Sequence, residues 1–229
     1  MKPVIGIISR PIKDELDRST NLVFDKCRSA IIRNGGIPMG IMPTSDIDYY
    51  NTLTKYIKEM TEEEKEDIIV QINRCDGILL QGGARWFNYD KFISNYCIEN
   101  NIPALHMCMS MQLLGNMDLA KKVDKVNLVK VEGHKSEEDY VHNIIIDNSS
   151  LLYEIIGKTK IMVNSRHNYA LPDTNELMVS ARGEDGTIEA IERKDKDFIL
   201  GVQWHPEIMC AYDEDQAKIL KYFINKSRR

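Results

Sequence analysis

The sequence predicts an α/β fold of three layers, in which helices cover both faces of a mainly parallel central sheet. Short β-branched apolar runs alternate with amphipathic stretches from Val4 to Met117, in the order βαβαβαβα. This order is typical of a mainly parallel sheet, because parallel strands need helical crossovers. Further along, the turn signal Glu184-Asp185-Gly186 separates two more apolar runs and predicts a smaller antiparallel section. We expect residues 1–229 to form one domain, since a chain of this length can hold one large α/β core.

The first predicted elements are strand, helix and strand. The β-branched run from Val4 to Ile8 predicts a buried strand, followed by a loop at Ser9-Arg10-Pro11. Apolar residues then recur at helical spacing from about Leu22 to Arg33, and this helix stops at Asn34-Gly35-Gly36. The chain resumes as a strand from Ile37 to Ile41.

Three predicted helical stretches and one strand lead to the middle of the chain. Ser45-Asp46 is typical of a helix cap, although the stretch from Lys55 to Met60 is ambiguous. Thr61 and Glu64 have the spacing of a capping box, which predicts a helix. A short apolar strand then ends at Gly82-Gly83, and a helix from roughly Tyr89 to Asn100 follows.

The second half of the chain is richer in strands. Residues from Ala120 to Tyr140 are polar and charged, which indicates an exposed excursion or irregular strands, and the lysines from Lys121 to Lys130 suggest a surface. The later elements are a β-rich run at Val141–Ile146, a short capped helix at Ser149–Gly157, strands at Lys160–Val163, Leu177–Ala181, Thr187–Ile191 and Phe198–Trp204, and a last helix from about Asp213 to Lys226.

Composition excludes several classes of protein. The 30 basic and 35 acidic residues leave a formal net charge of −5, which argues against a general nucleic-acid or membrane-surface role. The N-terminal apolar run is too short for a signal peptide and no run reaches membrane-spanning length, so we expect a cytoplasmic protein. The five cysteines include no Cys-x-x-Cys pair, and this indicates reduced thiols rather than disulfides or a zinc site.

The stretch from Pro103 to Met117 contains the candidate nucleophile. A short apolar run ends at Cys108, and the residues after it recur at helical spacing, so the pattern predicts strand, sharp turn and helix. The N-terminus of that helix offers free amide donors and a positive dipole end, which favour a thiolate. This arrangement is a nucleophile elbow. The alternative is a buried structural cysteine in a core strand.

A candidate base lies near the other end of the chain. His205 and Glu207 stand two residues apart, just past the apolar strand that ends at Trp204, and Pro206 between them stiffens the turn. A cysteine nucleophile needs a base, and the base needs an orienting acceptor. His205 and Glu207 fit these roles, and an elbow cysteine in the same chain favours a triad over an isolated histidine.

Two other patterns have plainer interpretations beside the functional ones. Gly82-Gly83 lets the backbone approach a ligand closely, but a strand-to-loop turn explains it as well. His134 and His142 flank an acidic segment, yet their spacing matches no metal template, and we interpret this region as a solvated loop. We therefore assign no metal site and no cofactor.

The sequence resembles the class I glutamine amidotransferase-like family, and within it the stand-alone gamma-glutamyl hydrolases related to gamma-glutamyl-GABA hydrolase. The resemblance covers nearly the whole chain and implies a flavodoxin-like three-layer fold. It depends on five segments, of which the last is the most specific: Leu79-Leu-Gln-Gly-Gly83, Cys108 through Gln112, Val163-Asn-Ser-Arg-His167, Asp185-Gly-Thr-Ile-Glu-Ala190 and Gly201-Val-Gln-Trp-His-Pro-Glu207.

The resemblance implies roles for individual residues. Cys108, His205 and Glu207 would form the catalytic triad, and the amides of Gly83 and Met109 the oxyanion hole. The glutamyl pocket would be lined by Gly82, Gln112, Ser165 and His167.

The sequence departs from the family pattern at three positions. His106 and Ser110 stand two residues before and after the cysteine, where the family usually has glycine. Ser110 should fit with little strain, whereas His106 either contacts substrate in a reshaped pocket or is a packed core histidine. Arg85 stands close after the glycine pair, where relatives often carry an acidic residue, and we hypothesise that it favours a leaving amine with a carboxylate or phosphate.

The resemblance implies an enzyme that hydrolyses a small-molecule γ-glutamyl amide through a glutamyl thioester, without a cofactor. One alternative is a glutaminase subunit that passes ammonia to a separate synthetase partner. We expect no synthetase domain within these 229 residues, which favours the stand-alone enzyme. A different alternative is a non-catalytic binding module, which the presence of cysteine, histidine and glutamate together disfavours. The sequence leaves open which amine is released and whether the chain forms a homodimer.

Overall fold

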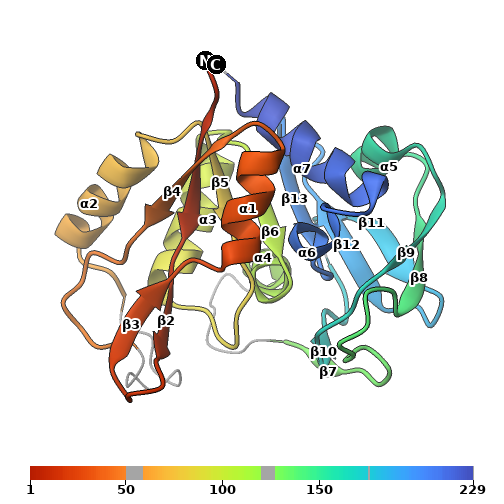
Figure 1. Ribbon diagram of the computed structural model, residues 1–229, viewed down its shortest axis with the longest axis horizontal. Helices are drawn as coiled ribbons and strands as arrows, with labels where there is room; N and C mark the ends of the chain where they lie inside the picture. Colours follow the sequence, from red (N-terminus) through yellow and green to blue (C-terminus); the bar gives the residue numbers. More distant parts are fainter. Residues whose placement is uncertain (50–58, 120–126, 175, 229) are drawn as a thin grey trace.

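The computed structural model describes residues 1–49, 59–119, 127–174 and 176–228. Within these ranges, nine strands form one central sheet in the order β4-β1-β5-β6-β13-β12-β11-β8-β9. Helices cover both faces of this sheet (Figure 1). The predicted fold class, a mainly parallel sheet between two helical layers with a smaller antiparallel section, is confirmed. None of the helices in the described part of the chain combines the length and apolarity needed to cross a membrane.

One half of the sheet is parallel throughout. In spatial order its strands are β4 (Ile37–Ile41), β1 (Val4–Ile8), β5 (Gly77–Leu80), β6 (Ala104–Met107) and β13 (Ile199–Val202). All four residues of β5, β6 and β13 are buried, as expected for central strands covered on both faces. The carboxyl ends of these strands therefore meet at one edge of the sheet, where ligands of open α/β sheets bind.

The other half is antiparallel. It contains β12 (Ile188–Glu192), β11 (Met178–Gly183), β8 (His142–Ile146) and β9 (Lys160–Val163), each antiparallel to its neighbours. The predicted turn at Glu184-Asp185-Gly186 joins β11 to β12, and Gly186 has a φ of 90° in the left-handed region that glycine permits.

The helices form two layers. One hydrophobic cluster packs side chains from one set of helices against the sheet, namely α1 (Asp25–Arg33), α5 (Leu151–Ile156), α6 (Pro206–Met209) and α7 (Glu214–Lys226). A second cluster covers the opposite face with α2 (Glu62–Ile72), α3 (Asn88–Glu99) and α4 (Met109–Leu119). In β6, Leu105 and Met107 face the first cluster and Ala104 the second, so successive side chains alternate between the layers.

Local capping signals explain several helix ends. Thr61 and Glu64 form the predicted capping box of α2, in which the Glu64 N–H donates to Thr61 Oγ1 and the Thr61 N–H donates to Glu64 Oε2. Ser150 caps α5, and the helix ends at Gly157, which has a φ of 76°. Asp213 caps α7 by accepting from two backbone N–H groups of the first turn.

Some elements differ from the sequence predictions. The loop predicted after β1 is an antiparallel hairpin of β2 (Arg10–Lys13) and β3 (Ser19–Leu22), so α1 begins at Asp25 rather than near Leu22. Asp14 at its turn accepts from the N–H groups of Leu16 and Arg18 and replaces the missing ladder bonds.

Other segments of the chain carry little regular structure. Residues 45–49 form no helix, and the ambiguous stretch that began at Lys55 lies largely outside the described residues. The same holds for most of the lysine-bearing stretch, of which β7 (Val129–Lys130) is described and exposed, paired with β10 (Tyr169–Ala170).

Candidate active site

Cys108 lies at the sharp turn between β6 and α4, so the predicted strand, turn and helix are confirmed. Its φ is 51°, in the left-handed region that residues other than glycine rarely adopt. The Cys108 N–H donates to the carbonyl of Val202 at 2.8 Å, and its own carbonyl accepts from the Gln112 N–H at 3.1 Å. These bonds hold a strained turn, and strain of this kind is concentrated at functional sites.

His205 and Glu207 lie where β13 passes into α6. Pro206 is the first residue of that short helix, and His205 precedes it with a non-helical backbone. The His205 Nδ1 lies 2.8 Å from Glu207 Oε1, so the carboxylate orients the ring and leaves Nε2 for other partners. Asn164 fixes the backbone of His205 from both sides, since its Oδ1 accepts from the His205 N–H and its Nδ2 donates to the His205 carbonyl.

The thiol and the imidazole meet beside Gly82. A Cβ at Gly82 would lie 3.2 Å from His205 Cε1 and 3.3 Å from Cys108 Cβ, so the two side chains flank the same glycine. Burial by itself would lower the pKa of His205, but the Glu207 carboxylate and a hydrogen bond with Cys108 outweigh it and hold the pKa well above its usual value. The three side chains are thus connected in the order thiol, imidazole, carboxylate, which is the order that nucleophilic catalysis requires.

Arg10 donates to backbone carbonyls of the loop that contains Gly82 and Gly83, here called the glycine loop, and this role was not predicted from the sequence. It is 3% exposed, its Nε donates to the Gly82 carbonyl at 3.0 Å, and Nη2 donates to the Gln81 carbonyl. Nη1 forms an ion pair with Asp90, which is fully buried. Burial raises the pKa of Asp90, and Arg10 opposes this rise. The position of Arg10 in a polar segment that predicted only a loop gave no signal of this role.

Ser110 completes the arginine's contacts. Arg10 Nη2 donates to Ser110 Oγ at 3.0 Å, and that hydroxyl donates to the Gln81 carbonyl at 2.9 Å. Gly83 lies beside the start of α4, since a Cβ there would lie 3.6 Å from Met109 Cε. The first N–H groups of a helix have no partner within it, so the Met109 amide is suited to bind an anion next to Gly83.

Two glutamines lie close to Cys108. Gln203 is fully buried in the segment after β13, and its Nε2 lies 3.7 Å from Cys108 Sγ. Gln112 Nε2 donates to the Gln203 Oε1 at 3.2 Å and to the Tyr169 carbonyl at 2.7 Å. Gln112 was predicted as a pocket residue. Gln203 was not, although it falls within the most specific of the quoted segments.

Two of the remaining predicted pocket residues, Ser165 and His167, contact backbone carbonyls of neighbouring segments. Ser165 is fully buried and its hydroxyl donates to the His134 carbonyl at 2.6 Å. His167 is 4% exposed, and its Nδ1 lies 3.1 Å from the Tyr169 carbonyl. Arg85 is partly buried in the segment between Gly83 and α3. Contact of these side chains with a substrate stays a prediction.

His106 is packed in the core. It lies in β6 on the same face as Ala104, and its side chain is fully buried. Burial lowers the pKa of His106 to about 3, so the ring is neutral. Of the two interpretations of this residue, substrate contact and core packing, the fully buried ring supports core packing.

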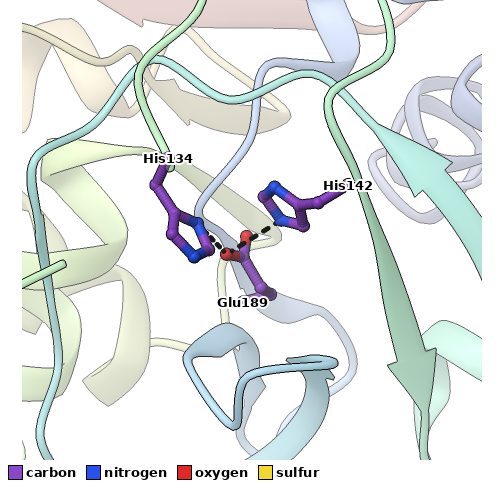
Figure 2. A group of neighbouring side chains, drawn as sticks. All are labelled: His134, His142 and Glu189. Atoms are coloured by element: carbon purple, nitrogen blue, oxygen red, sulfur yellow. Dashed lines mark ion pairs between the residues drawn. The ribbon is translucent and has the colours of Figure 1, made fainter. Parts of the chain in front are cut away.

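The interpretation of His134 and His142 as part of a solvated loop was wrong. His134 is 4% exposed, and both rings lie against Glu189, which is fully buried on β12 (Figure 2). The loop folds back over the antiparallel half of the sheet, so sequence spacing alone could not bring these groups together. Within the described part of the chain, these three residues form a group that could hold a metal ion, with one ligand atom from each lying within 4.8 Å of the others.

This fold, with a cysteine at the elbow beside a histidine and a glutamate, defines a class of protein, the glutamine amidotransferase-like proteins. The family model of Peptidase C26 matches residues 87–207, a range that contains Cys108, His205 and Glu207. The chain therefore belongs to the Peptidase C26 family.

Relatives agree with this assignment. A protein of Lactococcus lactis described as glutamine amidotransferase-like, YvdE, is 28% identical over 209 residues, which cover 79% of this chain and 86% of the relative. Protein NtpR of Enterococcus hirae is 29% identical over 240 residues, covering 99% of this chain and all (100%) of the relative. CTP synthase of Sulfurisphaera tokodaii is 27% identical, and the match covers 66% of this chain and 34% of the synthase.

Solved structures share the fold. The glutaminase domain of Trypanosoma brucei CTPS with bound acivicin has a TM-score of 0.68 at 16% identity, covering 98% of this chain and 93% of the other. PurLQS of Thermotoga maritima has a TM-score of 0.63 at 16% identity, covering 98% and 99%. At this identity the likeness concerns the fold alone.

Proposed function

We propose that the chain is a cysteine-dependent hydrolase that cleaves the γ-glutamyl amide bond of a small γ-glutamyl compound and releases glutamate and an amine. One observation carries the proposal, namely that His205 lies between the Cys108 thiol and the Glu207 carboxylate, next to Gly82. Membership of the Peptidase C26 family supports a hydrolase of this type.

In the first step His205 takes the proton of Cys108, and Sγ attacks the γ-carbonyl carbon. The carbonyl oxygen becomes an oxyanion that accepts hydrogen bonds from the N–H groups of Gly83 and Met109. Loss of one such donor typically raises the barrier by about 3 kcal/mol, so the backbone position of Gly83 matters as much as the thiol. Gln203 Nε2 is placed to donate to Sγ.

In the second step the oxyanion collapses, the C–N bond breaks and the His205 imidazolium gives its proton to the departing amine. The raised pKa of His205 supports this role, because the ring keeps the proton until the leaving nitrogen needs it. A glutamyl thioester remains. His205 then takes a proton from water as the oxygen attacks the thioester, the C–S bond breaks, and glutamate leaves with Cys108 restored.

The glutamyl group would lie beside Gly82, with Gln112 and the segment of Ser165 and His167 as its wall. Arg85, after the glycine loop, would contact the leaving amine, and a guanidinium favours an amine that carries a carboxylate or phosphate. The Arg85→Ala variant should lower kcat/KM for anionic γ-glutamyl amides and leave neutral ones unchanged. Equal kcat/KM for both substrates in the variant and wild type would contradict this role.

A second candidate is a glutaminase subunit that supplies ammonia to a separate synthetase. The CTP synthase relatives and the fold likeness to a CTPS glutaminase domain favour it. The two functions share the triad and differ in the substrate and in the need for a partner. A stand-alone hydrolase should release glutamate from γ-glutamyl amides of larger amines without any other protein, whereas a subunit should act on glutamine and be slow alone.

The test combines labelling and turnover. Acivicin, bound in the CTPS neighbour, should label Cys108 of the wild type but not of the His205→Ala variant. Cys210→Ala is a matched control, because Cys210 is only partly buried, whereas the other four cysteines are buried, and it should not be needed for labelling. Glutamate release from a panel of γ-glutamyl amides then identifies the leaving amine. Labelling that persists in Cys108→Ser, or no glutamate from any substrate, would refute the proposal.

A further inference from the structure

A second cluster of chemistry-bearing side chains lies in the antiparallel half of the sheet. Glu189 on β12 is fully buried, and three imidazoles surround it: His134 from the loop after β7, His142 at the start of β8, and His167 after β9. Figure 2 shows His134 and His142 on opposite sides of the Glu189 carboxylate, with their rings directed toward it. The proposed hydrolysis uses neither His134, His142 nor Glu189.

Hydrogen bonds determine which ring nitrogen carries the proton in His134 and in His167. His134 Nε2 lies 2.9 Å from Asp185 Oδ2, and a carboxylate can only accept, so Nε2 carries the proton. His167 Nδ1 lies 3.1 Å from the Tyr169 carbonyl, so Nδ1 carries the proton there. In the neutral rings, His134 Nδ1 and His167 Nε2 therefore present lone pairs.

Both of these lone pairs face a carboxylate oxygen. His134 Nδ1 lies 3.2 Å from Glu189 Oε1, and His167 Nε2 lies 3.6 Å from the same oxygen. Neither nitrogen, and neither oxygen of Glu189, has a well-formed hydrogen bond among the described residues. Acceptors that face one another in a buried site need a cation between them, and that cation is either a proton on each ring or a metal ion.

The spacing of the donors suits a metal. Four ligands at the 2.0–2.1 Å typical of zinc are separated by about 3.4 Å along the edges of a tetrahedron. The Glu189 oxygen lies 3.2 Å from His134 Nδ1, 3.2 Å from His142 Nε2 and 3.6 Å from His167 Nε2. Ligand atoms of His134, His142 and Glu189 all lie within 4.8 Å of one another, so displacements on the order of 1 Å would place these three atoms around one ion. His167 would join them from the side of the Glu189 Oε1 oxygen.

We propose that His134, His142, His167 and Glu189 bind one divalent transition-metal ion, with zinc as the best match. Imidazole nitrogens and one carboxylate suit zinc, whereas calcium and magnesium prefer oxygen donors. Asp185 orients His134 through its other nitrogen and the Tyr169 carbonyl orients His167, which is the outer shell that metal-binding histidines usually have.

The ion would have a structural task beside the candidate active site. The His134 carbonyl accepts from the Ser165 hydroxyl and from the His167 N–H, so the loop and the proposed pocket wall are already connected. A metal that binds His134 on one side and β8 and β12 on the other would fix that loop on the sheet. Four protein ligands leave no open position, which is typical of a structural rather than a catalytic zinc.

The experiment measures metal binding and avoids the nucleophile. Zinc can also bind a thiol beside an imidazole, so the Cys108→Ser variant is used throughout. Zinc sulfate is titrated by calorimetry into full-length chelator-treated protein, and we expect one site with a Kd on the order of 1 µM or tighter. Zinc at 100 times that Kd should raise Tm by roughly 5–10 °C.

Matched variants locate the site. In the same background, His142→Gln and Glu189→Gln should weaken zinc binding by at least tenfold, whereas His205→Gln removes an imidazole outside the cluster and should leave it unchanged. Should the cluster variants fail to fold, the Co²⁺ absorption of the Cys108→Ser protein remains as a test, with a tetrahedral spectrum free of thiolate bands expected. No binding at these concentrations, or equal binding in Glu189→Gln, would overturn the proposal.

Discussion

Replacing Arg10 with methionine should separate its contribution to stability from its contribution to catalysis. Methionine keeps much of the length of the side chain and removes all of its donors. Arg10 is 3% exposed and Asp90 is fully buried, so the change leaves a buried carboxylate without its cation. It also removes the Arg10 donors to the carbonyls of Gly82 and Gln81, of which the Gln81 carbonyl keeps the Ser110 hydroxyl as a donor.

The expected loss of stability and the expected loss of activity have different causes. Breaking one side of a buried ion pair typically costs about 3–5 kcal/mol, a large part of a total stability of about 5–15 kcal/mol. Protonation of Asp90 relieves part of this cost, because burial already raises its pKa. The glycine loop carries the proposed oxyanion donor of Gly83, and displacing such a donor costs about 10²–10³ in kcat.

The double variant Arg10→Met/Asp90→Asn is the control. Asparagine keeps an oxygen for the Phe87 N–H, which now donates to Asp90 Oδ2 at 2.8 Å, and carries no charge. Urea denaturation should therefore show that the double variant regains about 2 kcal/mol or more over the single variant. Its kcat for glutamate release should stay low. A single variant with kcat/KM within about threefold of wild type, or a double variant no more stable than the single, would refute this reasoning.

Three further predictions use other groups. Gly82→Ala places a methyl group 3.2 Å from His205 Cε1 and 3.3 Å from Cys108 Cβ. We therefore expect kcat to fall at least tenfold with little change in Tm. An unchanged kcat would contradict the close approach of these two side chains. Glu207→Gln removes the charge that raises the pKa of His205, so kcat should fall by about 10²–10⁴ and its alkaline limit should move to lower pH. The pKa of His106 is about 3 in the folded protein and near 6.5 in the unfolded chain. The unfolded chain therefore binds a proton at His106 that the folded protein does not, and the free energy of unfolding falls as the pH drops from 6.5 toward 3. Denaturation of wild type and of His106→Leu should therefore show that the unfolding free energy of wild type, relative to the variant, falls by about 2 kcal/mol from pH 7 to pH 5. A difference that is the same at both pH values would refute this prediction.

The fold could be predicted from the sequence because its strands and helices follow strong local patterns. The runs at Val4–Ile8 and Ile37–Ile41 are strands of the sheet, and the Thr61 capping box begins α2. The positions of Cys108 and of His205 were also predictable, since both residues follow buried strands whose carboxyl ends meet at one edge.

The contacts that join distant segments could not be predicted in this way. Arg10 reaches Asp90 across 80 positions, and His134 reaches Glu189 through a folded-back loop. Neither segment has a periodic pattern, because each is polar and irregular on its own. Their partners are fixed by tertiary packing, which a single sequence does not encode in its spacing.

Ser110 stands where the resemblance implies a glycine, and its side chain makes contacts that a glycine could not make. The residue is fully buried. Its hydroxyl accepts from Arg10 and donates to the Gln81 carbonyl, so this side chain connects α4 to the loop of Gly82 and Gly83. The two parts of the proposed oxyanion hole, Met109 on that helix and Gly83 in that loop, are thereby held by one hydroxyl and one guanidinium. The serine thus adds two hydrogen bonds to a buried network that connects α4 and this loop, and such a network favours one arrangement of the two parts when all its members are paired.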